Sequence, residues 1–229
     1  MSSSDFLRKN INQHSVKNSL SKGMDSDVDA AVHDLIESLK KRHPELIFEH
    51  KKKLALTEII AHLSPRYPEL KESFSQVMDE SFIRPDGGFL YASNQKGEKH
   101  LILVAEVKHQ GTNDKRQEEG LPIQAKGNAI ERLGKNLIGI RAIFKKEAII
   151  PFICFGSGYD FQPKSTILDR VVTMNEFFPL NEFFITKNHA PFEPVSMFFR
   201  YENWSTKEMI DGMDKVAEAA IQHYFPLKP

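Results

Sequence analysis

Two apolar runs joined by one amphipathic segment constrain the fold of this chain more than any other feature. The first run, Leu101–Lys108, reads LILVAEVK, and the second, at 148–155, reads AIIPFICF. Between them, from Gly127, apolar residues recur at the three- and four-residue spacings of a helix that buries one face: Ile130, Leu133, Leu137, Ile140 and Phe144. Unbroken apolar runs are typical of strands covered on both faces, and strand, helix and strand in this order form a parallel βαβ unit. The chain is therefore predicted to have an α/β fold.

The residues before the first run predict an antiparallel partner strand. Asp86 lies in the sequence Pro-Asp-Gly-Gly, which is typical of a bend, and apolar residues follow it. The segment Asn94–Glu98 contains Gly97, which can supply the positive φ of a hairpin turn. An antiparallel hairpin joined to a parallel unit gives a central mixed β-sheet flanked by helices.

The other elements follow from the same rules. Asp27 is a suitable N-cap for a helix that runs through Leu39 and ends before Pro44. Residues 1–24 are polar and lack periodicity, which predicts a flexible N-terminal arm followed by a single domain over residues 25–229. Within that domain we also expect helices at 54–63, 73–80 and 207–224, an extended segment at 46–48, and strands at 182–186 and 195–201.

The composition favours a soluble protein from a reducing compartment. Hydrophobic residues make up 40% of the 229 residues, which is enough for a substantial core. The single cysteine, Cys154, lies in the second apolar run and is predicted to be a core residue. No run approaches the roughly 20 apolar residues that span a bilayer, and no signal peptide follows Met1. We therefore expect a cytoplasmic protein with no membrane partner.

Charge is balanced overall but is distributed unevenly. Lys plus Arg and Asp plus Glu both total 31, whereas residues 40–53 contain six basic and two acidic side chains, and residues 108–146 contain nine and four. Basic clusters of this kind occur on DNA-binding faces, but also on ordinary solvated surfaces. Charge alone favours the solvated surface.

Three residues of the predicted hairpin have the pattern of a metal site. Side chains alternate along a strand, so Glu106 and Lys108 point the same way, and the hairpin returns Glu106 towards Asp86. Two adjacent carboxylates repel each other unless a cation neutralises them, and oxygen ligands suit Mg²⁺. Pro85-Asp86, nineteen residues, then Glu106-Val107-Lys108 is the pattern PD-(D/E)xK. Taken alone, the pattern is weak and favours a structural interpretation, a common turn followed by a salt-bridged strand, over a catalytic one.

The chemistry that such a site supports is phosphodiester hydrolysis. That reaction needs a cation at the scissile phosphate and a water molecule held in line with it. Asp86, Glu106 and the backbone carbonyl of Val107 are candidate Mg²⁺ ligands. Lys108 is a candidate for orienting or activating the water.

Three segments, IRPDGGFLYA, LVAEVKHQG and KGNAIERLGKN, resemble those of the EcoRI-type type II restriction endonucleases in order and separation. The resemblance covers most of residues 25–175 and implies the PD-(D/E)xK restriction-endonuclease core. It implies Mg²⁺-dependent cleavage of double-stranded DNA, with Asp86, Glu106 and Lys108 as catalytic residues. It also implies a prokaryotic protein that acts as a homodimer, whose functional counterpart is a cognate DNA methyltransferase.

The segment GNAIER is the family's DNA-reading element, which enters the major groove and reads a central AATT. Asn can pair with adenine through two hydrogen bonds, Arg can donate to purine N7, and Glu can accept from an amino group, so these residue types fit the role. The resemblance assigns DNA contacts to Lys126, Gly127, Asn128, Ala129, Glu131, Arg132 and Arg170.

The outer base pair of the site is left open by the sequence. Gln124-Ala125-Lys126 stands where the GAATTC-cutting members have small or apolar residues, and Thr173 stands where they have a second arginine. RAATTY, CAATTG and GAATTC therefore all remain candidate recognition sequences. Cleavage is expected to leave 5′-phosphate ends and 5′-AATT overhangs.

Two other functions remain open at this point, a structure-directed DNA repair or recombination nuclease and a DNA-binding protein that has lost catalysis. His109, Lys115 and Arg116 can be interpreted as phosphate contacts or as solvated side chains.

Overall fold

The computed structural model describes residues 26–69, 80–110, 113, 119–121, 129–145, 147–189 and 191–226. A five-stranded sheet of order β1-β4-β5-β6-β7 forms its centre. The first three strands in this order pair antiparallel and the last three pair parallel, which confirms the predicted mixed sheet. The strands are β1 (Ile47–Lys51), β4 (Phe89–Ser93), β5 (Lys99–His109), β6 (Phe152–Ser157) and β7 (Ser196–Arg200).

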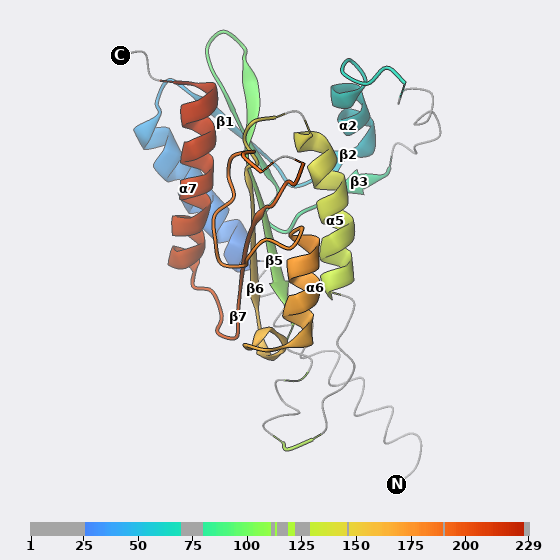
Figure 1. Ribbon diagram of the computed structural model, residues 1–229. Coiled ribbons are helices and arrows are strands. Elements are labelled where there is room, and N and C mark those ends of the chain that lie inside the picture. The colour runs from blue at the N-terminus through green and yellow to red at the C-terminus, as the bar shows by residue number, and fades with distance from the viewer. Residues whose placement is uncertain are drawn as a thin grey trace.

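Helices cover both faces of this sheet (Figure 1). The helix at 26–42 and α7 (Thr206–Tyr224) cover one face, and α5 (Ala129–Phe144) and α6 (Thr166–Met174) cover the other. Beyond α5 lie α2 (Leu56–Leu63) and a two-stranded sheet of β2 (Leu54–Ala55) and β3 (Phe82–Ile83). Serine side chains cap the first turns of α6 and α7.

The sheet separates two hydrophobic cores, and its side chains alternate between them. Ile153 and Phe155 of β6 pack with α7, whereas Phe152 and Cys154 pack with α5. Cys154 is fully buried, so the prediction that it is a core residue is confirmed. On β5, Val104 packs on the α5 side, and period-two alternation places Glu106 and Lys108 on that side as well.

The crossover from β5 to β6 determines where α5 begins. Because β5 and β6 are parallel, α5 runs back against them, and its first turn lies at the end of the sheet where β5 finishes (Figure 1). The two glycines of α5 allow close packing, as expected. A Cβ atom at Gly134 would lie 3.2 Å from Met174 Cε, and one at Gly139 would lie 2.5 Å from Ile83 Cδ1.

One predicted strand is wrong. The segment 182–186 contains no strand, only an isolated bridge between Thr186 and Ile149. Asn181 has a φ of 66°, and the segment is held to β7 by side chains: Asn181 Oδ1 accepts from the Phe199 amide and Ser196 Oγ from the Phe184 amide. A backbone in the left-handed region cannot extend a regular ladder, so the apolar residues Phe183, Phe184 and Ile185 alone were misleading here.

The remaining predicted elements differ mainly in their boundaries. The helix expected at 54–63 begins at Leu56, since Leu54 and Ala55 form β2, and the second apolar run becomes a strand only at Phe152. The arm at 1–24 and most of the helix expected at 73–80 lie outside the described residues. Among the described helices, none is both long and apolar enough to cross a membrane.

Candidate active site

The hairpin of β4 and β5 brings Asp86 beside Glu106. Gly88, with a φ of 72°, turns the chain into β4, and the Gly87 amide donates to the Ala105 carbonyl at 2.9 Å. A Cβ atom at Gly87 would lie only 2.7 Å from the Ala105 Cβ, so a larger residue would push the bend away from β5. The Asp86 amide then donates to Glu106 Oε2 at 3.0 Å. The predicted proximity of the two carboxylates is confirmed.

The Lys108 ammonium lies at the centre of the three predicted metal-ligating residues. Its Nζ is 2.6 Å from Asp86 Oδ2, 2.5 Å from Glu106 Oε1 and 2.8 Å from the Val107 carbonyl oxygen. The Val107 amide also donates to Asp86 Oδ2 at 3.3 Å, which fixes that carboxylate against the strand. Three oxygens from a bend and a strand thus converge on one cationic group.

Burial makes this cluster electrostatically unusual. Glu106 is 1% exposed, and loss of hydration, together with the neighbouring Asp86, raises its pKa although Lys108 opposes this. Burial also disfavours the charge on Lys108, but the attraction of Glu106 and Asp86 outweighs it and raises the pKa of the lysine. The ammonium therefore stays charged while it is shared by two carboxylates.

These residues fit a divalent cation. With both carboxylates ionised, two negative charges share one ammonium, which leaves a net charge of −1 in a largely buried place. Carboxylate and carbonyl oxygens are the donors that Mg²⁺ prefers, and the ammonium stands in for such a cation. Among the described residues, no group of three or more His, Cys, Asp or Glu side chains could hold a metal. Three protein oxygens would leave the other positions of an octahedral ion for water and substrate.

Asn136 of α5 also contacts Glu106, and sequence reasoning missed it. Its Nδ2 lies 3.4 Å from Glu106 Oε1, on the side where α5 covers β5. His50 was missed as well; its Nε2 lies 2.8 Å from the Gly87 carbonyl oxygen and holds the bend. Both contacts cross between elements distant in sequence. The only local signal for Asn136 was its position four residues after Arg132 on one helix.

Those predicted DNA-reading residues that the structure describes lie at the end of the sheet where β5 finishes. Glu131 and Arg132 are exposed in the first turn of α5, whose first residue is Ala129. Arg170 is exposed on α6, the helix that packs beside α5. Lys126, Gly127 and Asn128 lie outside the described residues, as do Lys115 and Arg116. His109 Nδ1 lies 3.3 Å from Ser157 Oγ, on the next strand.

Comparison with known proteins identifies the family. The family described as "Restriction endonuclease EcoRI" matches residues 12–167, which include Asp86, Glu106, Lys108 and the segment GNAIER. The chain belongs to the EcoRI restriction endonuclease family.

Two members of the EcoRI family show how far the similarity extends. The type II restriction enzyme EcoRI of Escherichia coli is 31% identical over 142 residues, which cover 58% of this chain and 50% of that enzyme. The type II restriction enzyme RsrI of Cereibacter sphaeroides is 24% identical over 224 residues, which cover 82% of this chain and 80% of that enzyme. The aligned part of the chain thus spans half the length of EcoRI.

The basic cluster at 40–53 is engaged within the fold of this EcoRI-family chain. Arg42 pairs with Glu218 at 3.0 Å, and Lys51 pairs with Glu58 at 2.7 Å. Lys40 pairs with Glu37 at 2.8 Å. These contacts support the interpretation of this cluster as an ordinary charged surface.

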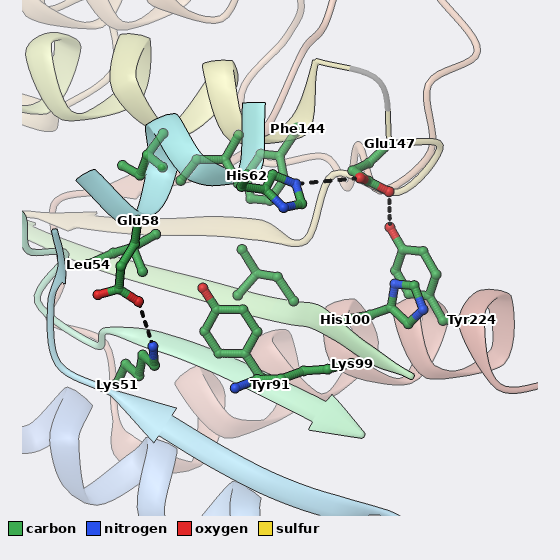
Figure 2. A pocket seen from close by; sticks show the side chains of 13 residues that line it. Lys51, Leu54, Glu58, His62, Tyr91, Lys99, His100, Phe144, Glu147 and Tyr224 are labelled. Carbon is green, nitrogen blue, oxygen red and sulfur yellow. Dashed lines mark hydrogen bonds and ion pairs between the residues drawn. The ribbon is translucent and has the colours of Figure 1, made fainter. Parts of the chain in front are cut away.

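A cavity of about 270 Å³ lies at the other end of the sheet, where β5 begins and α5 ends. At one side Glu147 accepts hydrogen bonds from Arg66 at 2.8 Å and from the Tyr224 hydroxyl at 3.1 Å. At the other side Lys51 pairs with Glu58 (Figure 2). Glu58 and Glu147, the carboxylates that line this cavity, each have a cationic partner, unlike Asp86 and Glu106, which share Lys108.

Proposed function

We propose that this protein is a type II restriction endonuclease that cleaves both strands of DNA in a Mg²⁺-dependent reaction. One observation carries the proposal: oxygens of Asp86, Glu106 and Val107 converge on a single cation position at the end of the sheet where α5 begins. A hydrolytic site and a candidate DNA-reading helix thus lie at one end of a single endonuclease domain.

The residues divide the work of hydrolysis. Asp86, Glu106 and the Val107 carbonyl would hold Mg²⁺, which supplies charge neutralisation at the scissile phosphate and makes a bound water more acidic. Because Mg²⁺ at this position would repel the ammonium, Lys108 would move away from the point where the three oxygens converge. Lys108 is thereby free to hold the attacking water and to stabilise negative charge in the transition state. In-line attack by water leaves a 5′-phosphate and a 3′-hydroxyl.

Sequence recognition is assigned to the segment that leads into α5. Asn128, Ala129, Glu131 and Arg132 would contact base edges of a central AATT, with Lys126, Gly127 and Arg170 nearby. The exposure of Glu131, Arg132 and Arg170 supports this role. Asn128→Ala should then reduce discrimination against a wrong base pair by about 1–3 kcal/mol.

A palindromic site requires a two-fold symmetric enzyme, so we propose a homodimer in which each subunit cuts one strand. Two large apolar side chains support an interface on the α5 and α6 side. Ile138 of α5 is 72% exposed, and Phe177, which follows α6, is 75% exposed. The functional counterpart would be a methyltransferase that protects the same site in a prokaryotic cytoplasm.

The test is digestion of a long DNA with the purified protein and Mg²⁺, followed by sequencing of all ends. We expect 5′-phosphate ends with 5′-AATT overhangs at one palindromic sequence, and no cutting when EDTA replaces Mg²⁺. Junction or flap substrates that are cut faster than any duplex would instead indicate a structure-directed nuclease. Binding without cutting under any metal would indicate a protein that has lost catalysis.

The outer base pair is tested by three plasmids that differ only at that pair. Lys126 can donate to a purine N7, which fits RAATTY or CAATTG. We expect cutting of a plasmid that carries CAATTG or AAATTT. Cutting confined to GAATTC would contradict this proposal and would indicate a strict GAATTC recognition sequence.

A further inference from the structure

Glu106 receives hydrogen bonds from three directions, and only one of them comes from another layer of the fold. Its Oε2 accepts from the Asp86 amide at 3.0 Å, and its Oε1 lies 2.5 Å from Lys108 Nζ and 3.4 Å from Asn136 Nδ2. Asp86 and Lys108 belong to the hairpin itself. Asn136 belongs to α5, so this amide joins the hairpin to the helix above it.

The contact from Asn136 becomes more important if a metal is bound. Lys108 would move away from the shared oxygens in that state, and the buried Glu106 then loses its strongest hydrogen-bond donor. Among the described residues, the Asp86 amide and the Asn136 amide are the hydrogen-bond donors to Glu106 that remain within reach. Neutral donors of this kind fix the orientation of a metal-binding carboxylate without competing for its charge.

Asn136 also lies on the same helix as the predicted DNA-reading residues. Arg132 and Asn136 are four residues apart, so they are neighbours along one side of α5. The flanking residues Leu133 and Leu137 are buried in the core, which makes this part of the helix a stiff connection. A displacement of the first turn of α5 therefore changes the distance between Asn136 and Glu106.

We propose that Asn136 is a positioning residue that couples the location of α5 to the orientation of Glu106. The proposal rests on the function proposed above, because it requires that Glu106 binds metal and that the start of α5 contacts DNA. A correct DNA sequence holds α5 in the position that places the Asn136 amide on Glu106. A wrong sequence displaces α5 and loosens the carboxylate. Metal affinity and sequence discrimination are then linked through one side chain.

The experiment compares Asn136→Ala with Asn136→Gln and with Gln222→Ala. Alanine is a better helix former than asparagine, so the loss of the amide should leave α5 intact, and thermal unfolding in EDTA checks this. Asn136→Gln retains an amide donor. Gln222 is an exposed amide on α7, on the opposite face of the sheet, and serves as the matched control.

The first measurement is Mn²⁺ binding to the free protein, followed by the loss of the electron paramagnetic resonance signal of the free ion. Mn²⁺ takes the same oxygen ligands as Mg²⁺. We expect Asn136→Ala to bind Mn²⁺ about 10- to 100-fold more weakly, Asn136→Gln to recover part of this loss, and Gln222→Ala to match the unmodified protein. Equal Mn²⁺ affinity for Asn136→Ala and the unmodified protein would overturn the proposal.

The second measurement is the Mg²⁺ concentration at half-maximal cleavage, for the preferred site and for a site with one changed base pair. The unmodified protein should need more Mg²⁺ at the changed site, and Asn136→Ala should reduce this difference while its affinity for DNA in EDTA stays unchanged. An undiminished difference would refute the coupling. If the unmodified protein binds Mn²⁺ but cuts no DNA, the proposed function fails, and with it the coupling, while the Mn²⁺ titration still decides whether Asn136 positions Glu106.

Discussion

The two ends of β5 hold acidic residues in opposite ways. Where the strand begins, Lys99 pairs with Glu49, and nearby Lys51 pairs with Glu58 and Arg66 with Glu147, so each of these carboxylates has at least one cation. Where the strand ends, Asp86 and Glu106 share Lys108 as their one cationic partner among the described residues. The first arrangement is neutral and mostly exposed, whereas the second has two described carboxylates for one ammonium, and its Glu106 is almost fully buried.

This difference separates stabilising ion pairs from a candidate reactive site. Paired charges near the surface contribute little to the free energy of folding. A buried excess charge costs stability in the absence of another cation, and proteins retain such costs mainly where function requires them. The charge balance of each cluster, rather than its number of acidic residues, therefore indicates which end of the sheet holds the candidate reactive site.

The largest expected effect is that of Lys108→Ala. Loss of the ammonium removes the group that is proposed to hold the attacking water, so the cleavage rate should fall by about 10²- to 10⁴-fold or more. Specific DNA binding in EDTA should remain. Single-turnover cleavage and gel-shift titration measure the two properties, and an unchanged cleavage rate would remove Lys108 from the mechanism.

Asp86→Asn tests the excess charge directly. The new side chain keeps an oxygen acceptor for the Val107 amide and for Lys108, and it leaves Glu106 and Lys108 as a neutral pair. Melting in EDTA should therefore be unchanged or slightly higher than for the unmodified protein. The stabilisation by Mg²⁺, about 2.7 kcal/mol at a hundred times its Kd, should disappear. A clear loss of stability in EDTA would show that the cluster is structural.

Glu147→Gln applies an analogous change to the other end of the sheet. Burial tends to raise the pKa of Glu147, but hydrogen bonds from Arg66 and Tyr224 outweigh this and lower it, so the charged form is stabilised by the fold. The variant should lose about 1–2 kcal/mol of stability in urea unfolding, with cleavage unchanged. If Glu147→Gln is more stable than Asp86→Asn, the ion pairs where β5 begins are not the stabilising ones, and the contrast between the two ends of the strand is wrong.

The smallest effect is expected for Glu208, which forms an exposed ion pair with Arg200 at the same end of the sheet as the candidate active site. Hydrogen bonds from Arg200 and from the Ser205 amide and hydroxyl lower the pKa of Glu208 from 4.5 to about 2. Because the folded-state pKa is lowered, this stabilisation is present above pH 4.5 and is lost as the pH falls towards 2.

Glu208→Gln should therefore destabilise the protein at neutral pH by less than about 1 kcal/mol, given its exposure. The difference from the unmodified protein should vanish as the pH approaches 2. Urea unfolding at several pH values measures this. A difference that does not change with pH would mean that the capping geometry, and not the charge, produces the effect.

Local patterns were sufficient for much of the fold because they report backbone periodicity and burial. The apolar runs around 101–108 and 148–155 predicted parallel strands, and the spacing from Ile130 to Phe144 predicted the helix between them. The same rules failed at 182–186, where the side chains of Asn181 and Ser196 accept hydrogen bonds from backbone amides and no regular backbone ladder forms. That arrangement depends on the neighbouring strand and leaves no periodic signal.

The sequence by itself determined the mixed sheet, the hairpin and the proximity of Asp86 to Glu106, since these follow from turn chemistry and strand alternation within one short stretch. Only the tertiary structure decided that Lys108 lies among the three oxygens, that Glu106 is buried, and that Asn136 reaches it from α5. Burial and contacts between layers depend on how distant segments pack, and electrostatic interactions are strong only where that packing excludes water.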